Sequence, residues 1–321
     1  VLGPLIARFG EVKVSLPGGC AWGPRPVDYH LKGLEELGAK VTLDSGYILA
    51  ESKKLQGKTI RFEYPSVGAT GNIAMAAVTA NGTTIIENAA REPEIEQLCI
   101  FLNKMGADIS GVGTDKLIIK GVSQLEPADI EVIPDRVEAG TFLMAGAALG
   151  EVTINKIVPT HLRTVLIKLE ETGAKVRTNQ NSITITRSDK IIPVDMTTAV
   201  FPGFPTDLQA QWVALMMLAE GSSVITDTVY HDRFSHVPEL NRLGANIHVE
   251  NNVAIIRGVK KLVGAPVMST DIRASASLIN GGLMAHGRTE VSRIYHIDRG
   301  YERIEEKFRS LGADIMRKTE S

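Results

Sequence analysis

The chain has 321 residues, of which 44% are hydrophobic and 22% are charged, as in a globular protein with one large core or two ordinary domains. A formal net charge of −2 and an aromatic content of 5% argue against nucleic-acid binding, which depends on basic patches and stacking rings. No apolar stretch is long enough to span a membrane, no signal-peptide pattern opens the chain, and Cys20 and Cys99 are too few for a disulfide framework. We therefore expect a cytoplasmic protein that neither binds nucleic acid nor inserts into a membrane.

A helix end followed by a short strand recurs five times along the chain. Each copy contains a Gly-Ala pair, preceded by apolar residues at helical spacing and followed by a β-branched or apolar run. The glycines lie 68, 67, 71 and 68 residues apart, and they are Gly38, Gly106, Gly173, Gly244 and Gly312. Glycine suits a helix end because it lacks the Cβ that clashes in the left-handed conformation. We predict a helix before each glycine and a strand directly after it.

A second series of glycines runs in phase with the first. Each member precedes a short β-branched run, and the spacings are 72, 68, 71 and 66 residues for Gly10, Gly82, Gly150, Gly221 and Gly287. Two independent markers with one period indicate an internal repeat of roughly 70 residues, which suits a small α/β module.

Each complete repeat also contains a second helix that is apolar on nearly all sides. These helices are predicted to begin near Ser66, Asp135, Pro205 and Asp271. A helix without a polar face is buried, so the N-termini of these helices should emerge at one end of each module. Free N–H groups and the positive end of the helix dipole favour phosphate or carboxylate ligands there.

Six motifs follow one another at set intervals along most of the chain. They are Leu-Pro-Gly-Gly-Cys at 16–20 with Arg-Pro-Val-Asp at 25–28, Pro-Ser-Val-Gly-Ala-Thr at 65–70, Glu-Asn-Ala-Ala-Arg-Glu-Pro-Glu-Ile at 87–95, Phe-Pro-Thr-Asp-Leu-Gln-Ala-Gln at 204–211, Arg-Phe-Ser-His-Val-Pro-Glu-Leu at 233–240, and Tyr-His-Ile-Asp-Arg-Gly-Tyr-Glu-Arg at 295–303. In identity and order these motifs resemble the enolpyruvyl transferase family, and within it the enzymes that use UDP-N-acetylglucosamine.

The resemblance implies an α/β (α+β) fold in which six βαβαββ units form two inside-out barrels with helices at their centres. Five helix ends are present, so we expect one unit to precede Val1, leaving a first domain at 1–134 that is incomplete and a second at 135–321. The family's catalytic lysine, its neighbouring asparagine and one substrate arginine belong to that preceding segment. We therefore expect the chain by itself to be inactive or severely impaired, and phosphate release after the segment is added back tests this.

The implied reaction transfers the enolpyruvyl group of phosphoenolpyruvate to the 3-hydroxyl of UDP-N-acetylglucosamine and releases phosphate. It proceeds by addition and elimination through a tetrahedral intermediate, and it commits the sugar nucleotide to peptidoglycan synthesis. The resemblance implies no cofactor and no catalytic metal, and the seven histidines show no metal-binding spacing.

Cys20 lies between Pro17 and Pro26 in a segment too rich in glycine and proline for a regular helix or strand. We interpret the segment as a mobile lid whose thiol lies beside Arg25, which would raise the thiolate fraction. The resemblance implies that Cys20 acts in proton transfer to the enolpyruvyl methylene or in product release, and that the epoxide fosfomycin modifies it. The alternative is an incidental surface thiol. Cys99, on the apolar face of a helix, is expected in the core.

Asp207 precedes a predicted buried helix, where a carboxylate is usually a simple cap. The resemblance implies instead that Asp207 is the base that removes the proton from the attacking sugar hydroxyl. Surface arginines are usually solvated, but guanidinium groups are natural partners of phosphate and carboxylate. By resemblance, Arg25 and Arg299 contact phosphoenolpyruvate and Arg233 completes the cationic pocket. We count Cys20, Asp207 and Arg299 as catalytic.

The sugar nucleotide is assigned to a further set of residues by resemblance. Ser66, Val67 and Gly68 open a helix with a small turn whose amides suit a diphosphate. The uridine is assigned to Pro26, Val27, Asp28 and Tyr29, and the acetamido sugar to Val229. Tyr64 stands where some family members carry a lysine, and His231 stands where an acidic residue is common and receives no role.

Three other arginines are interpreted as structural. We expect Arg273, Arg91 and Arg136 to pair with nearby acids such as Asp271, Glu94 and Glu138. Two rival functions stay open. The shikimate-using sister transferase shares the fold but lacks the Gly-Gly-Cys motif, and a non-catalytic sugar-nucleotide-binding protein would bind without turnover.

Overall fold

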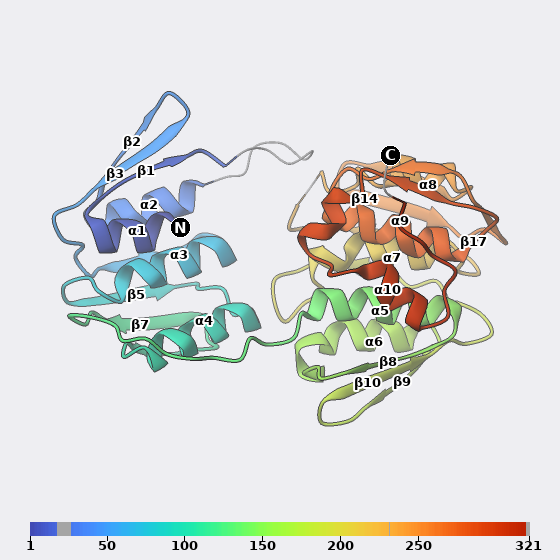
Figure 1. The fold of residues 1–321 in the computed structure, drawn as a ribbon, viewed down its shortest axis with the longest axis horizontal. Coiled ribbons are helices and arrows are strands. Elements are labelled where there is room, and N and C mark those ends of the chain that lie inside the picture. The colour runs from blue at the N-terminus through green and yellow to red at the C-terminus, as the bar shows by residue number, and fades with distance from the viewer. Residues whose placement is uncertain (18–26, 231, 319–321) are drawn as a thin grey trace. The chain divides into compact units, whose positions relative to one another are not determined.

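The computed structural model describes residues 1–17, 27–230 and 232–318, and these divide into two compact units, Val1–Ile133 and Pro134–Ser321 (Figure 1). Both units mix helices with short strands. No helix in the described part of the chain is both long enough and apolar enough to cross a membrane.

The first unit has a buried helix, α3, and two sheets. Its helices are α1 (Leu2–Phe9), α2 (Asp28–Glu36), α3 (Val67–Ala77) and α4 (Pro93–Lys104). Its strands are β1 (Glu11–Ser15), β2 (Lys40–Asp44), β3 (Tyr47–Glu51), β4 (Thr59–Arg61), β5 (Thr83–Glu87), β6 (Asp108–Ser110) and β7 (Lys116–Lys120). One sheet is antiparallel in the order β1-β3-β2, and the other has the order β4-β5-β7-β6 with only β4 and β5 parallel. The other three helices pack against α3.

The second unit repeats this arrangement with more elements. Its helices are α5 (Arg136–Leu149), η1 (Pro159–Leu162), α6 (Arg163–Glu171), η2 (Thr206–Leu208), α7 (Gln209–Met216), α8 (Val237–Arg242), α9 (Ile272–Met284), η3 (Ile294–Arg299) and α10 (Ile304–Ser310). Its strands are β8 (Glu151–Asn155), β9 (Lys175–Thr178), β10 (Ser182–Thr186), β11 (Met196–Thr197), β12 (Ser222–Thr226), β13 (Asn246–Glu250), β14 (Val253–Arg257), β15 (Leu262–Val263), β16 (Pro266–Met268), β17 (Ala285–His286) and β18 (Glu290–Ser292). The sheets have the orders β8-β10-β9, β11-β12-β14-β13, β15-β17 and β16-β18.

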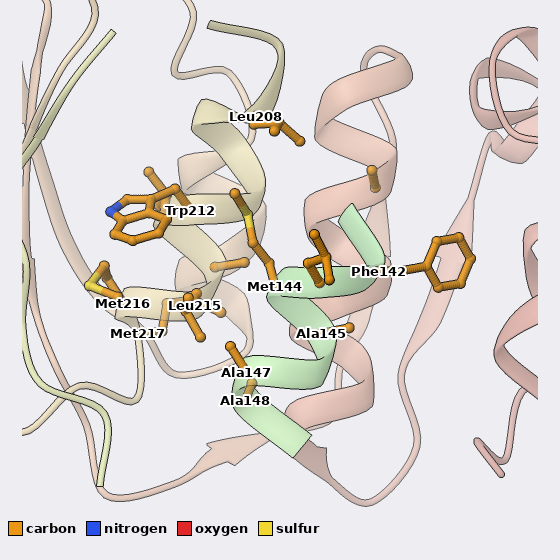
Figure 2. Packing of buried hydrophobic residues seen from close by; sticks show 14 of the residues in the cluster. Phe142, Met144, Ala145, Ala147, Ala148, Leu208, Trp212, Leu215, Met216 and Met217 are labelled. Carbon is orange, nitrogen blue, oxygen red and sulfur yellow. The ribbon is translucent and has the colours of Figure 1, made fainter. Parts of the chain in front are cut away.

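Three helices, α5, α7 and α9, pack against one another in the centre of the second unit. Every residue of α7 is buried, and its Trp212 and Leu215 lie in the same core as Phe142 and Met144 of α5 (Figure 2). The prediction of helices that are apolar on nearly all sides is therefore confirmed. The surrounding strands form separate sheets, and the described residues contain no closed hydrogen-bonded barrel.

The predicted helix ends are confirmed at all five Gly-Ala pairs. The glycines have φ values of 87°, 99°, 91°, 89° and 94°, in the left-handed region that only glycine enters without strain. A strand follows the first four glycines, as β2, β6, β9 and β13. The fifth expected strand, after Gly312, is not formed. In the described residues no strand pairs with this segment, and the Ile315 carbonyl instead accepts hydrogen bonds from the Arg309 guanidinium.

Cys99 is fully buried on α4, as predicted. Burial, assisted by the charge of Glu96, raises the pKa of its thiol to about 11, so the thiolate is negligible at neutral pH.

Gly121 and Gly258 occupy equivalent places after β7 and β14 in different repeats. Their amides donate to the carbonyls of Gly82 and Gly221, at 2.9 and 2.8 Å. A Cβ atom at Gly258 would overlap the backbone carbonyl oxygen of Ala219, in the turn between α7 and β12, so the backbone there would have to shift. We predict that Gly258→Ala lowers the unfolding free energy by about 1–3 kcal/mol in urea denaturation.

The matched control for that substitution is Gly150→Ala. Gly150 has an extended φ of 176°, and no atom lies within 4 Å of the place that an alanine methyl group would occupy. We expect its replacement to change stability by less than about 1 kcal/mol. Equal effects of the two substitutions would contradict the steric argument.

Candidate active site

Asp207 is held between two arginines of the second unit. Its Oδ1 lies 2.5 Å from Nη2 of Arg233, and its Oδ2 lies 3.0 Å from Nη2 of Arg273. The two guanidinium side chains are only 7% and 16% exposed, whereas the Asp207 side chain is 38% exposed. Two nearly buried cations therefore lie beside one carboxylate that solvent still reaches.

Three separate segments bring these side chains together. Asp207 lies in the short η2 turn before α7, where the fully buried Leu208 anchors the turn in the core. Arg233 precedes α8, and Arg273 is the second residue of α9. Because α7 and α9 pack directly against each other, the contact between Asp207 and Arg273 forms where both helices begin.

The arginines also determine the protonation state of Asp207. Burial by itself would raise the pKa of this carboxyl group, but the charges of Arg273 and Arg233 and the hydrogen bonds that they donate lower the pKa to about 2. Asp207 is therefore ionised throughout the physiological pH range.

The partner predicted for Arg273 is wrong. Its guanidinium binds Asp207, whereas Asp271 caps α9 by accepting hydrogen bonds from the backbone N–H groups of Arg273 and Ala274, at 2.8 and 3.0 Å. Oδ1 of Asp271 satisfies these N–H groups, which have no partner within the helix, and its Oδ2 accepts hydrogen bonds from the hydroxyls of Ser235 and Thr270, at 3.4 and 3.2 Å. Arg273 therefore belongs to the candidate site, although its sequence position suggested a structural ion pair.

Arg273 also contacts the Tyr301 hydroxyl, and Glu138 pairs with a lysine. Burial would lower the pKa of Arg273, but the charge of Asp207 and contact with the Tyr301 hydroxyl raise it. Tyr301 is itself buried, and its hydroxyl lies 2.8 Å from Thr141 Oγ1. Glu138 forms an ion pair with Lys307 at 2.5 Å.

Val229 lies in a tight turn beside the cluster of Asp207, Arg233 and Arg273, called the Asp207 cluster below. The buried carboxylate of Asp227 accepts hydrogen bonds from the backbone N–H groups of Val229 and Tyr230, both at 2.9 Å, and from the Thr206 hydroxyl at 2.7 Å. Thr206 in turn accepts a hydrogen bond from Nη1 of Arg233 at 2.9 Å. The turn that carries Val229 is thus connected to the turn that carries Asp207.

In the first unit, the predicted diphosphate residues lie at the N-terminus of α3. Ser66 is the N-cap, and its hydroxyl accepts a hydrogen bond from the Ala69 N–H at 3.3 Å. Gly68 faces His30 of α2, because a Cβ at Gly68 would lie 3.1 Å from the histidine Nε2. The absence of a side chain at Gly68 leaves the helix terminus open toward this ring.

Three of the residues predicted near uridine, Val27, Asp28 and Tyr29, lie at the start of α2, which packs against α3. Val27 is the N-cap of α2 and Asp28 is its first residue. The Tyr29 ring packs edge-on against Phe62, with 5.9 Å between the centroids. The structure therefore brings these residues close in one unit with the start of α3.

Several predicted residues are not placed at the Asp207 cluster. Arg299 ends η3 and is exposed, and among the described residues its guanidinium makes no hydrogen bond or ion pair. Cys20, Arg25 and Pro26 lie outside the described residues, as does His231. No group of three His, Cys, Asp or Glu side chains in the described ranges is arranged to hold a metal ion.

Comparison with known proteins identifies the class. A family model described as EPSP synthase (3-phosphoshikimate 1-carboxyvinyltransferase) matches residues 1–308, so the chain belongs to this family of carboxyvinyltransferases. Within it, the chain is similar to UDP-N-acetylglucosamine 1-carboxyvinyltransferases. The protein of that name from Chlorobium luteolum is 56% identical over 320 residues, which are 99% of this chain and 76% of the relative. The one from Myxococcus xanthus is 52% identical over 318 residues, with the same coverage.

Solved structures agree with this assignment of the fold. The enolpyruvyl transferase NikO from Streptomyces tendae superposes with a TM-score of 0.88 at 27% identity, covering 98% of this chain and 75% of that one. An EPSP synthase from Acinetobacter baumannii gives a TM-score of 0.71 at 19% identity, covering 96% and 75%, which supports the fold alone. The fold and family predicted from the six motifs are confirmed.

Proposed function

We propose that this chain transfers the enolpyruvyl group of phosphoenolpyruvate to the 3-hydroxyl of UDP-N-acetylglucosamine, with release of phosphate. The observation that carries the chemistry is the Asp207 carboxylate between the guanidinium groups of Arg233 and Arg273. The choice of sugar acceptor is supported by relatives named for that reaction, which are 52–57% identical along almost all of the chain. The shikimate-using structure is only 19% identical.

In this proposal Asp207 accepts the proton of the attacking sugar hydroxyl, and the arginines hold the anionic groups of phosphoenolpyruvate. Buried guanidinium groups suit phosphate and carboxylate because they donate several hydrogen bonds in a fixed plane. A carboxylate with a pKa of about 2 is a weak proton acceptor, since general bases work best when their pKa is near the working pH. We therefore propose that the guanidinium groups bind the substrate anion in place of Asp207. Because their positive charge is then partly neutralised, the pKa of Asp207 rises when the substrate is present.

Removing one arginine tests this electrostatic balance. Arg273→Gln removes one of the two positive charges that lower the pKa of Asp207. This pKa is therefore expected to rise from about 2 toward its ordinary value near 4. The pKa is measured from the ¹³C shift of the Asp207 carboxyl group during a pH titration. Arg242→Gln is the matched control, because Arg242 lies on α8 and pairs with Glu239 instead, at 3.9 Å. An unchanged titration in Arg273→Gln would contradict the balance.

The sugar nucleotide is assigned to three sets of residues. We propose that the diphosphate binds the open α3 terminus at Ser66, Val67 and Gly68, where backbone N–H groups and the helix dipole favour an anion. In the same proposal Pro26, Val27, Asp28 and Tyr29 surround uridine, and Val229 contacts the acetamido group.

Cys20 is proposed to serve in proton transfer or product release and to be the site of fosfomycin modification, with Arg25 and Arg299 contacting phosphoenolpyruvate. The proposal places the enzyme in the cytoplasm, at the step that commits sugar nucleotide to peptidoglycan and thereby to cell shape and division. Mass spectrometry of the intact protein after incubation with fosfomycin and UDP-N-acetylglucosamine should reveal one adduct, at Cys20. Modification at Cys99 instead would contradict the assignment.

Phosphate release distinguishes the proposed function from its rivals. With the preceding segment that the resemblance implies added back, turnover is expected with phosphoenolpyruvate and UDP-N-acetylglucosamine, and none is expected when 3-phosphoshikimate replaces the sugar nucleotide. Binding of the sugar nucleotide by calorimetry without any phosphate release would favour the non-catalytic alternative.

A further inference from the structure

Asp227 is a buried carboxylate that has no part in the proposed chemistry. Its exposed fraction is 0%, and among the described residues no lysine, arginine or histidine pairs with it. In the described ranges, four donors contact its two oxygens: the hydroxyls of Thr198 and Thr206 and the backbone N–H groups of Val229 and Tyr230. Burying a carboxylate without a cation is unfavourable unless hydrogen bonds compensate, and here they do.

The donors are divided unequally between the two oxygens. Oδ1 accepts from Thr198 at 2.8 Å and from both N–H groups of the turn at 2.9 Å. Within the part of the chain that the structure describes, Oδ2 accepts only from the Thr206 hydroxyl, at 2.7 Å. Oδ1 therefore shapes the turn that carries Val229. Oδ2 acts on the turn that carries Asp207.

The Thr206 hydroxyl has a single proton, which it donates in the hydrogen bond to Oδ2 of Asp227. The lone pairs of Thr206 Oγ1 are consequently directed to another donor, which is Nη1 of Arg233 at 2.9 Å. Arg233 uses its other terminal nitrogen, Nη2, to bind Asp207. A continuous chain of hydrogen bonds thus leads from Asp227 through Thr206 and Arg233 to Asp207.

We propose that Asp227 is a positioning residue. Its Oδ2 orients the Thr206 hydroxyl and, through that hydroxyl, the Arg233 guanidinium group relative to Asp207. Its Oδ1 fixes the turn that carries Val229. The proposal rests on the proposed function, in which Asp207 is the base and Val229 contacts the sugar. A hydrogen-bonded pair is sensitive to direction, so a reversed donor at Asp227 should misplace Arg233 without unfolding the unit.

Asp227→Asn is the most selective test, since it keeps the shape of the side chain. The amide oxygen is expected to remain on the Oδ1 side, where three donors need an acceptor. The amide NH₂ group then faces Thr206 and competes with Arg233 as a second donor. Thr206→Val removes the hydrogen bond between Thr206 and Asp227 by removing its donor, the hydroxyl. Thr206→Ser retains the hydroxyl.

We expect Asp227→Asn and Thr206→Val each to lower kcat at least about tenfold, with the affinity for UDP-N-acetylglucosamine changed less than about threefold. The double variant should be no slower than the single ones, because both break one chain of contacts. Thr206→Ser should restore kcat to within about threefold. Thr153→Val is the matched control, because Thr153 pairs with Thr184 on the exposed face of β8 and β10.

A second measurement does not depend on turnover. The Arg233 guanidinium N–H signals in ¹⁵N NMR, assigned with Arg233→Lys, should be sharp in the unsubstituted protein and in Thr206→Ser, and broadened in Asp227→Asn and Thr206→Val. Failure of the unsubstituted protein to release phosphate, with the preceding segment added back, would contradict the proposed function, and the guanidinium signals would still decide this inference. Sharp signals in both variants, or multiplied losses of kcat in the double variant, would overturn it.

Discussion

Replacement of Asp207 by asparagine is expected to lower turnover by about 10²–10⁴-fold, the usual contribution of a general base, with little change in the affinity for UDP-N-acetylglucosamine. The amide cannot accept the proton of the sugar hydroxyl, and it also removes the negative charge that Arg233 and Arg273 share. Phosphate release in the steady state, with the preceding segment added back, gives kcat, and calorimetric titration gives the affinity.

The matched control is Asp195→Asn. Asp195 lies in the same unit and accepts a hydrogen bond from the Val224 N–H at 2.7 Å, without any contact to the arginines. Thermal unfolding of both variants checks that the fold is retained, as expected for a side chain that is 38% exposed. Loss of kcat by less than about tenfold in Asp207→Asn, with the fold intact, would mean that another group is the base.

Acidification is expected to destabilise the second unit through His236. Burial, assisted by the charge of Arg233 and opposed by that of Asp271, lowers the pKa of this histidine from 6.5 to about 4. Its Nε2 is buried without a hydrogen-bond partner in the described residues, which suits the neutral ring. His236 therefore binds a proton below about pH 6.5 in the unfolded chain, but only below about pH 4 in the folded chain.

The sign of the effect follows from this difference in proton binding. Stability is unaffected above pH 6.5, falls as the pH decreases to about 4, and changes no further below that for this group. The histidine contributes a loss of about 3 kcal/mol over the interval, since each pKa unit corresponds to about 1.4 kcal/mol. Urea denaturation at pH 7 and pH 4.5 measures the loss for the whole protein.

His236→Gln separates this contribution from that of the carboxylates. The variant should lose clearly less stability between the two pH values than the unsubstituted protein, whatever its stability at pH 7. His286→Gln, at an exposed position on β17, should retain the full loss. The same pH dependence in all three proteins would show that His236 is accessible to protons in the folded state.

The repeat was predictable because its signals are local. A glycine that ends a helix is decided by its own φ angle, and the left-handed conformation at Gly38, Gly106 and Gly173 depends only on the adjacent turn. Burial on all sides is likewise visible in the composition of a helix such as α7. The missing strand after Gly312 shows the limit of local reasoning, because a strand also requires a partner.

The candidate site was predictable only in part. The motif at 204–211 indicated Asp207, and Arg233 was expected near it, as the structure confirms. Arg273 was missed, since Asp271 two residues away seemed a sufficient partner. The available signal was that Asp271 opens a buried helix and was therefore needed as its cap. The roles of Cys20, Arg25 and Arg299 stay predictions.

The amino-acid sequence by itself determined the period, the helix ends and the buried helices, since each depends on neighbouring residues. It also determined the family, because motifs in a set order record common ancestry. Only the tertiary structure decided which charges meet. Asp207 and Arg273 are 66 positions apart, and their contact exists only once α7 and α9 are packed. Thr206 and Arg233 are 27 positions apart, and their contact exists only once the segment before α8 lies against the turn before α7. The physical reason is that an ion pair depends on distance and burial, neither of which a chain position specifies.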